Sequence, residues 1–166
     1  MGDRGWDRAA VDLYARYRAG EVAPDQMVEE LPPVWRCRSR ADPLGDPAAW
    51  RAMVDHAGYF VWASGEASAR RVRRPLLARR LFRGATADRR FGMSWTRNPA
   101  IARDFAVNRQ PDGVYDGQVW VGVFEPAQLL AYLRDEREYL VDAADAEVHP
   151  WSPGADGWLR RLRHWA

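Results

Sequence analysis

The sequence lacks lysine entirely and has a single cysteine among its 166 residues, so all 25 basic residues are arginine. Without lysine there can be no Walker-type phosphate lysine, no Schiff-base lysine and no lysine general base. Because Cys37 has no second cysteine to pair with, an internal disulfide is excluded, which suits a reducing compartment.

Long apolar runs are also missing. The longest, such as YFVWA at residues 59–63, are too short to cross a bilayer. The first residues, MGDRGWDRAAVDLY, show no apolar run after a basic start and hence no signal peptide. We therefore expect a cytoplasmic protein with no membrane partner.

Metal ligands and serine nucleophiles have little support. The three histidines, His56, His149 and His164, stand apart without the spacing of a metal site, so no metal is expected. No serine lies in a Gly-Xaa-Ser-Xaa-Gly turn, which leaves a nucleophile triad unsupported. A net charge of +2 is too small to mark the whole chain as a nucleic-acid binder.

What the sequence does contain is a globular composition, 47% apolar with nine tryptophans, in a length that fits one domain. Its first part, residues 1–78, reads mainly as helices. Helices are predicted at 6–19, at 24–31 ending before the Pro32-Pro33 pair, and at 47–57 behind a capping Asp46, with a loop from 32 to 46.

The second part, residues 79–166, reads as strands with a few helices. Strands are predicted at 80–85, 92–96, 117–125, 138–142 and 146–151, and helices at 98–108, 126–133 and 156–165. The expected fold class is α+β, with N-terminal helices packed on a split, mostly antiparallel mixed sheet, in one compact domain.

Three elements of the second part carry polar residues suited to one site. Arg83 stands on the predicted strand LFRGA, where a half-buried arginine needs an anionic partner, and Gly84 beside it would let a ligand approach the backbone. In GMSWT, Ser94 and Thr96 share one strand face while Trp95 faces the core. In DEREYLVD, the i, i+2 spacing of Glu136 and Glu138 predicts two carboxylates side by side, which is costly unless a cation faces them.

Taken in order, these residues resemble the R-S-E signature of the cholera-toxin-like ADP-ribosyltransferases. The resemblance covers roughly residues 79 to 150, through LFRGA, GMSWT followed by AIARDFA, and DEREYLVD. It implies an ADP-ribosyltransferase-like fold and an enzyme that transfers ADP-ribose from NAD to a macromolecular acceptor. The segment of ten residues between Arg83 and Ser94 is shorter than in many family members, so the N-terminal helices could replace a missing part.

The resemblance assigns NAD-binding roles to five positions. Arg83 would hold a phosphate and ribose, Gly84 would lie near the nicotinamide amide, and Ser94 would bind the nicotinamide ribose. Trp95 and Thr96 would support that strand.

Three further roles concern nicotinamide and the chemistry. Phe105, on the following helix, could stack on nicotinamide or simply pack its helix. Glu138 matches the catalytic glutamate of the family. Glu136 matches the variable position of the motif, where glutamate accompanies transfer to arginine.

Other functions remain open. The same site could transfer ADP-ribose to water, as an NAD glycohydrolase, or to nucleic acid, whose phosphates the arginine-rich run at 69–80 could contact. That run could equally be a solvated helix face interrupted by Pro75. A non-enzymatic NAD- or nucleic-acid-binding module is a further alternative. The biological setting, as a toxin with an antitoxin or immunity partner, a phage-encoded modifier or a defence factor, is open too.

Overall fold

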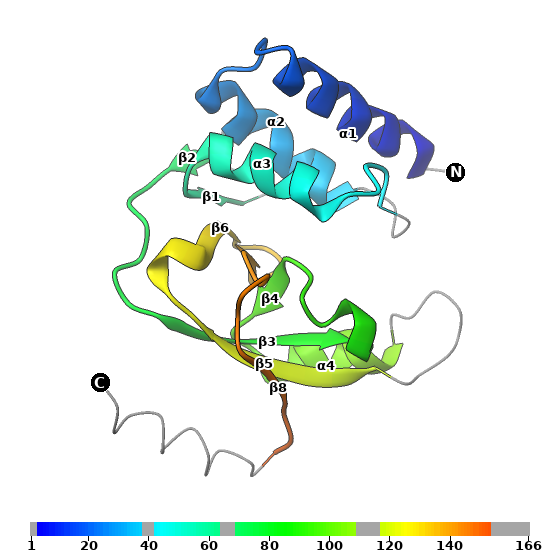
Figure 1. Ribbon diagram of the computed structural model, residues 1–166, viewed down its shortest axis with the longest axis vertical. Coiled ribbons are helices and arrows are strands. Elements are labelled where there is room, and N and C mark those ends of the chain that lie inside the picture. The colour runs from blue at the N-terminus through cyan, green and yellow to red at the C-terminus, as the bar shows by residue number, and fades with distance from the viewer. Residues whose placement is uncertain (1–2, 38–41, 64–68, 109–116, 154–166) are drawn as a thin grey trace.

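The computed structural model describes residues 3–37, 42–63, 69–108 and 117–153. Three helices form a layer at one end of the molecule, and a mixed sheet runs from beneath them to the other end, where a fourth helix packs on it (Figure 1). The predicted C-terminal helix at 156–165 lies outside the described residues. No described helix has the length and apolar character needed to span a membrane.

The three N-terminal helices are α1 (Asp3–Arg18), α2 (Pro24–Cys37) and α3 (Pro47–Ala57). The predicted start of α3 is confirmed, because the Asp46 carboxylate accepts a hydrogen bond from the Ala48 amide at 2.8 Å and Pro47 occupies the first turn. α3 ends before Gly58, whose φ of 72° is one that residues with a side chain rarely adopt.

The prediction that Pro32 and Pro33 end the second helix is wrong, since α2 continues through both to Cys37. A proline inside a helix removes a backbone hydrogen bond and costs about 3 kcal/mol. The continuation buries Val34 and Trp35 behind Leu31. Burying a large apolar side chain stabilises by about 1.5–3 kcal/mol. Two such side chains therefore offset much of the cost of the prolines.

The sheet has eight strands in the order β2-β1-β6-β7-β4-β3-β5-β8. All neighbours are antiparallel except β1 and β6, which confirms an α+β protein with a mostly antiparallel mixed sheet. The strands are β1 (Phe60–Trp62), β2 (Arg70–Arg71), β3 (Arg79–Ala85), β4 (Ser94–Thr96), β5 (Gln118–Phe124), β6 (Leu129–Leu133), β7 (Glu138–Val141) and β8 (Val148–Pro150).

Three strands differ from the sequence prediction. β1 and β2 come from the part read mainly as helices, and β2 begins the arginine-rich run, so the helix-face interpretation of that run is wrong. The predicted helix at 126–133 is instead a short 3-10 turn, η2 (Pro126–Gln128), followed by β6. Leu129, Leu130 and Leu133 are all buried. A short run that is apolar on both faces does not distinguish helix from strand by periodicity.

The helix α4 (Pro99–Asn108) forms as predicted, with Asn98 as its cap, because the Asn98 side chain accepts a hydrogen bond from the Ala100 amide at 2.9 Å. α4 packs on β3 and β5. Beside it, β3 and β4 share the single residue pair Phe82↔Thr96. The sheet stays hydrogen-bonded through all its strands, so the expected split appears only as this narrow junction.

Candidate active site

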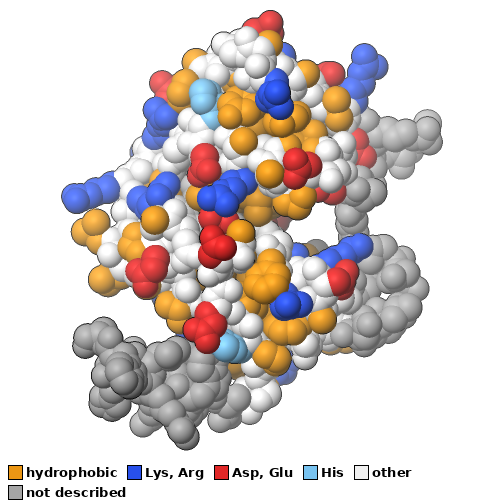
Figure 2. Space-filling view, viewed as in Figure 1, with side chains coloured by type: hydrophobic (Ala, Val, Ile, Leu, Met, Phe, Trp, Pro, Cys, Tyr) orange, Lys and Arg blue, Asp and Glu red, His pale blue; other side chains and the backbone are white. Residues whose placement is uncertain are grey.

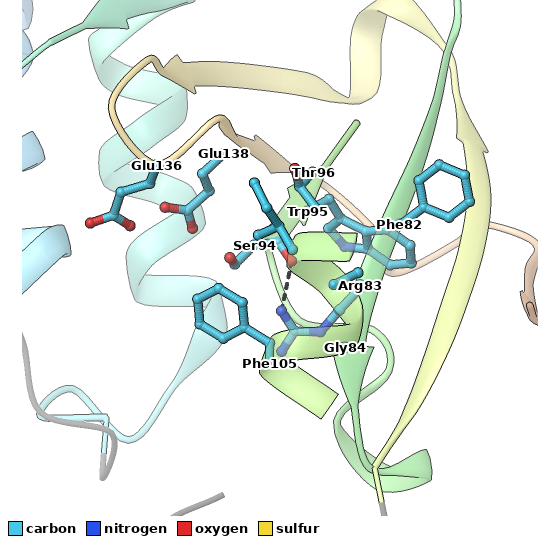
Figure 3. A pocket seen from close by; sticks show the side chains of 11 residues that line it. Phe82, Arg83, Gly84, Ser94, Trp95, Thr96, Phe105, Glu136 and Glu138 are labelled. Atoms are coloured by element: carbon cyan, nitrogen blue, oxygen red, sulfur yellow. Dashed lines mark hydrogen bonds between the residues drawn. The ribbon is translucent and has the colours of Figure 1, made fainter. Parts of the chain in front are cut away.

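A pocket opens at the junction of β3 and β4 (Figure 3). On the molecular surface the protein is hollowed between the helical layer and the opposite end of the sheet (Figure 2). The pocket is lined by every residue that the sequence analysis assigned to the site, and also by Phe82, Ile101 and Ala102. The assigned residues are Arg83, Gly84, Ser94, Trp95, Thr96, Phe105, Glu136 and Glu138.

The Arg83 guanidinium is held by backbone carbonyls. Its Nε donates to the Arg89 carbonyl at 3.0 Å, and its Nη1 donates to the Ser94 carbonyl at 2.7 Å (Figure 3). Gly92 leaves room for it, since a Cβ at that position would lie 2.4 Å from Arg83 Nη2. These two bonds fix the orientation of the guanidinium.

The loop that carries the Arg89 carbonyl includes the 3-10 turn η1 (Ala87–Arg89). A hydrogen bond from the Thr86 side chain stabilises the ionised Asp88 carboxylate, which holds the pKa of Asp88 below its usual value. This contact is local, between residues two positions apart, and it helps to shape the loop on which Arg83 rests.

β4 places its residues as the alternation predicts. Trp95 is 1% exposed, lies in the core beside Phe124, and donates through its indole N–H to the Gly92 carbonyl at 2.7 Å. The Thr96 hydroxyl accepts a hydrogen bond from the Asn98 amide at 3.2 Å, where α4 begins. Ser94 is half-buried at the pocket. Trp95 and Thr96 therefore expose little surface to a ligand and support the strand that carries Ser94.

Packing against α4 requires a glycine at position 84. A Cβ on Gly84 would lie 1.8 Å from the Ala102 carbonyl oxygen and 2.6 Å from the Ala106 nitrogen, both in α4. The space on the Cβ side of Gly84 is thus filled by the helix, while Gly84 also lines the pocket. Close docking of α4 brings Phe105, 42% exposed, to the mouth of the pocket (Figure 3).

The prediction that Glu136 and Glu138 stand on one strand face is wrong in its local geometry. β7 begins at Glu138, whereas Glu136 lies in the turn after β6. Between them Arg137 has a φ of 50°, a left-handed conformation that breaks strand alternation. Both side chains nevertheless line the pocket and point to the same side (Figure 3).

The last turn of α2 supplies a partner to each glutamate. The Trp35 indole N–H donates to Glu138 Oε1 at 3.3 Å, and Glu138 is only 7% exposed. Arg36 Nε donates to Glu136 Oε1 at 3.1 Å. Hydrogen bonds to an ionised carboxylate are charge-assisted and stabilise it. These two contacts therefore offset the repulsion between the Glu136 and Glu138 carboxylates that the sequence led us to expect.

Sequence reasoning missed Trp35 and Arg36 because it assigned them to a loop. The sequence did contain a signal for the longer helix. Val34 and Trp35 are apolar and follow Leu31 at the helical spacing of three and four residues, so they continue the buried face of α2. Nothing in the sequence pairs these residues with glutamates about a hundred positions away.

Among the described residues, no group of three or more histidine, cysteine, aspartate and glutamate side chains is placed to hold a metal ion. Comparisons of the chain with protein-family models, with curated proteins and with solved structures give no match.

Proposed function

We propose that the protein is an NAD-dependent mono-ADP-ribosyltransferase with an ADP-ribosyltransferase-like fold, acting on a macromolecular acceptor, with protein arginine favoured. One observation carries the proposal. Arg83, Ser94, Glu136 and Glu138, from three separate segments of the chain, line a single pocket.

The pocket suits the nicotinamide–ribose end of NAD as substrate. Phe105 offers an exposed ring on which nicotinamide can stack, and the oriented Arg83 guanidinium offers a cation to a phosphate. The Ser94 hydroxyl can donate to or accept from a ribose hydroxyl.

Glu138 has the position of an electrostatic catalyst. When the bond between C1′ of the ribose and the nicotinamide nitrogen breaks, the nitrogen keeps the electron pair and positive charge develops on the ribose. An ionised Glu138 beside the ribose stabilises that charge. The Trp35 N–H holds this carboxylate in place before the substrate arrives.

Glu136 is more exposed and lies nearer solvent than Glu138, which suits a group that meets the acceptor. As the acceptor nitrogen forms its bond to C1′, it loses a proton, and the Glu136 carboxylate can take that proton as general base. Nicotinamide leaves and the acceptor carries ADP-ribose.

A second candidate function, NAD hydrolysis, is favoured by a specific contact. Arg36 already pairs with Glu136, so an external arginine must compete for it, whereas water needs no such exchange. Transfer to nucleic acid has less support. In the arginine-rich run, Arg71 donates to the Ala57 carbonyl at 2.7 Å and Arg74 to the Ala127 carbonyl at 3.1 Å, so both serve the protein's own structure.

The test is incubation of the purified protein with NAD labelled in its adenylate part, alone and with a cell lysate. Nicotinamide release is measured in both, and labelled macromolecules are digested separately with protease and nuclease. Release together with protease-sensitive label supports the proposal. Release without label indicates a glycohydrolase, and nuclease-sensitive label indicates a nucleic-acid acceptor. If no nicotinamide is released with or without lysate, the proposed function is wrong.

A further inference from the structure

The Arg36 guanidinium is enclosed on two sides. Its Nε donates to Glu136 Oε1 at 3.1 Å, and its Cζ lies 5.9 Å from the centre of the Trp62 ring. These two partners come from different parts of the fold, the turn before β7 and the end of β1. They are adjacent because the Arg134 amide donates to the Trp62 carbonyl at 2.8 Å, which ties that turn to β1.

A carboxylate and an aromatic face together recognise a guanidinium. The carboxylate accepts N–H bonds in the plane of the group, and the ring attracts its flat, positively charged face. An ammonium of equal charge has no such plane and stays more strongly hydrated. The arrangement therefore selects arginine-like cations over other cations.

We propose that Glu136 and Trp62 form the seat for the acceptor guanidinium, and that Arg36 fills this seat in the free protein. The role as acceptor seat rests on the proposed transferase function, whereas guanidinium binding does not. Arg36 then acts as an internal competitor that an acceptor arginine must displace. Displacement is feasible because Arg36 and Glu136 are 40% and 39% exposed, and exposed ion pairs are weak.

Arg36 competes with an external guanidinium although its own contacts are weak, because its attachment to the chain gives it an effective concentration on the order of millimolar. Removing Arg36 should therefore strengthen binding of an external guanidinium by about fivefold, the magnitude of one exposed ion pair with a cation–π contact. Trp62 becomes a specificity residue of the acceptor site, which shares Glu136 with the pocket that holds the residues assigned to NAD.

The first experiment needs no NAD. Agmatine, a small guanidinium compound, is titrated into Arg36→Ala and the wild type, with n-butylammonium as a cation without the planar group. The readout is the Trp62 indole N–H resonance, identified by its loss in Trp62→Phe. Arg36→Gln serves as a second variant if Arg36→Ala is poorly folded.

The matched control is Arg16→Ala. Arg16 pairs with Glu30 at 2.7 Å with nearly the same exposure as the Arg36 pair, 41% and 38%, but neither residue lines the pocket. The Arg16→Ala variant should bind agmatine as weakly as the wild type does. Saturable binding about fivefold tighter in Arg36→Ala, lost again when Glu136→Gln is added, supports the seat. Equal binding in wild type and Arg36→Ala, or equal binding of n-butylammonium, overturns it.

The second experiment adds NAD and measures agmatine labelling and nicotinamide release together. Arg36→Ala should show an agmatine KM about fivefold below that of Arg16→Ala. If agmatine binds Arg36→Ala as expected but the wild type releases no nicotinamide, the seat stands and the transferase proposal fails. If nicotinamide is released but agmatine binding does not change, the reverse holds.

Discussion

The two walls of the pocket are held by different kinds of contact. On the wall formed by β3, β4 and α4, Arg83 is bonded to backbone carbonyls six and eleven positions away. On the opposite wall, Glu138 and Glu136 are bonded to side chains 103 and 100 positions away. The first wall is local in sequence, and the second exists only where α2 meets the sheet.

In the proposed function, this difference separates the residues that would bind NAD from those that would carry the chemistry. The local wall presents a cation and an aromatic ring, the groups suited to NAD. The distant wall orients two carboxylates, and it does so through the helical layer. The helix α2 therefore holds the two glutamates of the pocket, although the residues matching the R-S-E signature all lie beyond residue 78.

The largest effect is expected for Glu138→Gln. Loss of one preorganised electrostatic partner lowers rates about a hundred- to a thousandfold. Nicotinamide release and acceptor labelling should both fall by that factor, while NAD binding through Arg83 persists. Gln keeps an oxygen for the Trp35 N–H, so the wall should remain in place. Full activity of Glu138→Gln would exclude the transferase mechanism.

Glu136→Gln should separate transfer from hydrolysis. General bases typically contribute a factor of a hundred or more. Transfer to agmatine should fall by about a hundredfold, whereas slow nicotinamide release to water continues. Parallel assays of release and labelling check this. Equal losses of nicotinamide release and agmatine labelling would show that Glu136 does not act on the acceptor alone.

Arg83→Ala should remove most of the stabilisation by NAD. A ligand at a hundred times its Kd adds about 2.7 kcal/mol, which thermal unfolding detects. The free variant should itself lose about 1 kcal/mol, because two carbonyls lose their donor. Arg80→Ala, on the same strand but outside the pocket, is the control and should keep the full NAD shift. An NAD shift that survives in Arg83→Ala would place the phosphates elsewhere.

Gly84→Ala should destabilise the local wall by about 2 kcal/mol, since the added Cβ collides with the backbone of α4. Gly5→Ala in α1 is the matched control. Its added Cβ meets no atom within 4 Å, so it should raise stability by about 0.5 kcal/mol through helix propensity. Unfolding midpoints of the two variants should therefore move in opposite directions. A neutral Gly84→Ala would mean that α4 does not dock this closely.

The smallest effect is expected for Trp35→Phe, which removes the N–H donor to Glu138 but keeps an aromatic ring against Trp50. At 3.3 Å the hydrogen bond is long, and its loss should cost about 1 kcal/mol. Trp50→Phe removes the neighbouring bond to Asp42, at 2.8 Å, outside the pocket. Both variants should lose stability, but only Trp35→Phe should slow nicotinamide release, by about fivefold. Equal slowing in the two would reduce Trp35 to a packing role.

The sequence by itself determined the features whose interactions close within a few residues. Asp46 and Asn98 each bond an amide two positions ahead, so they cap α3 and α4 wherever those helices lie. The strand alternation that buries Trp95 between Ser94 and Thr96 is likewise a property of adjacent residues. The order of Arg83, Ser94 and Glu138 along the chain was enough to suggest one site.

Tertiary structure decided what depends on distant partners. α2 continues through Pro32 because Trp35 finds a buried place against Trp50, a contact worth more than local propensity. Residues 129–133 form a strand because β1 and β7 lie on either side and pair with them through backbone hydrogen bonds. One cation, Arg36, and one N–H donor, Trp35, reach Glu136 and Glu138 from α2. A pair of carboxylates in the sequence indicates only that a positive partner is needed, and the packing of α2 decides which residue supplies it.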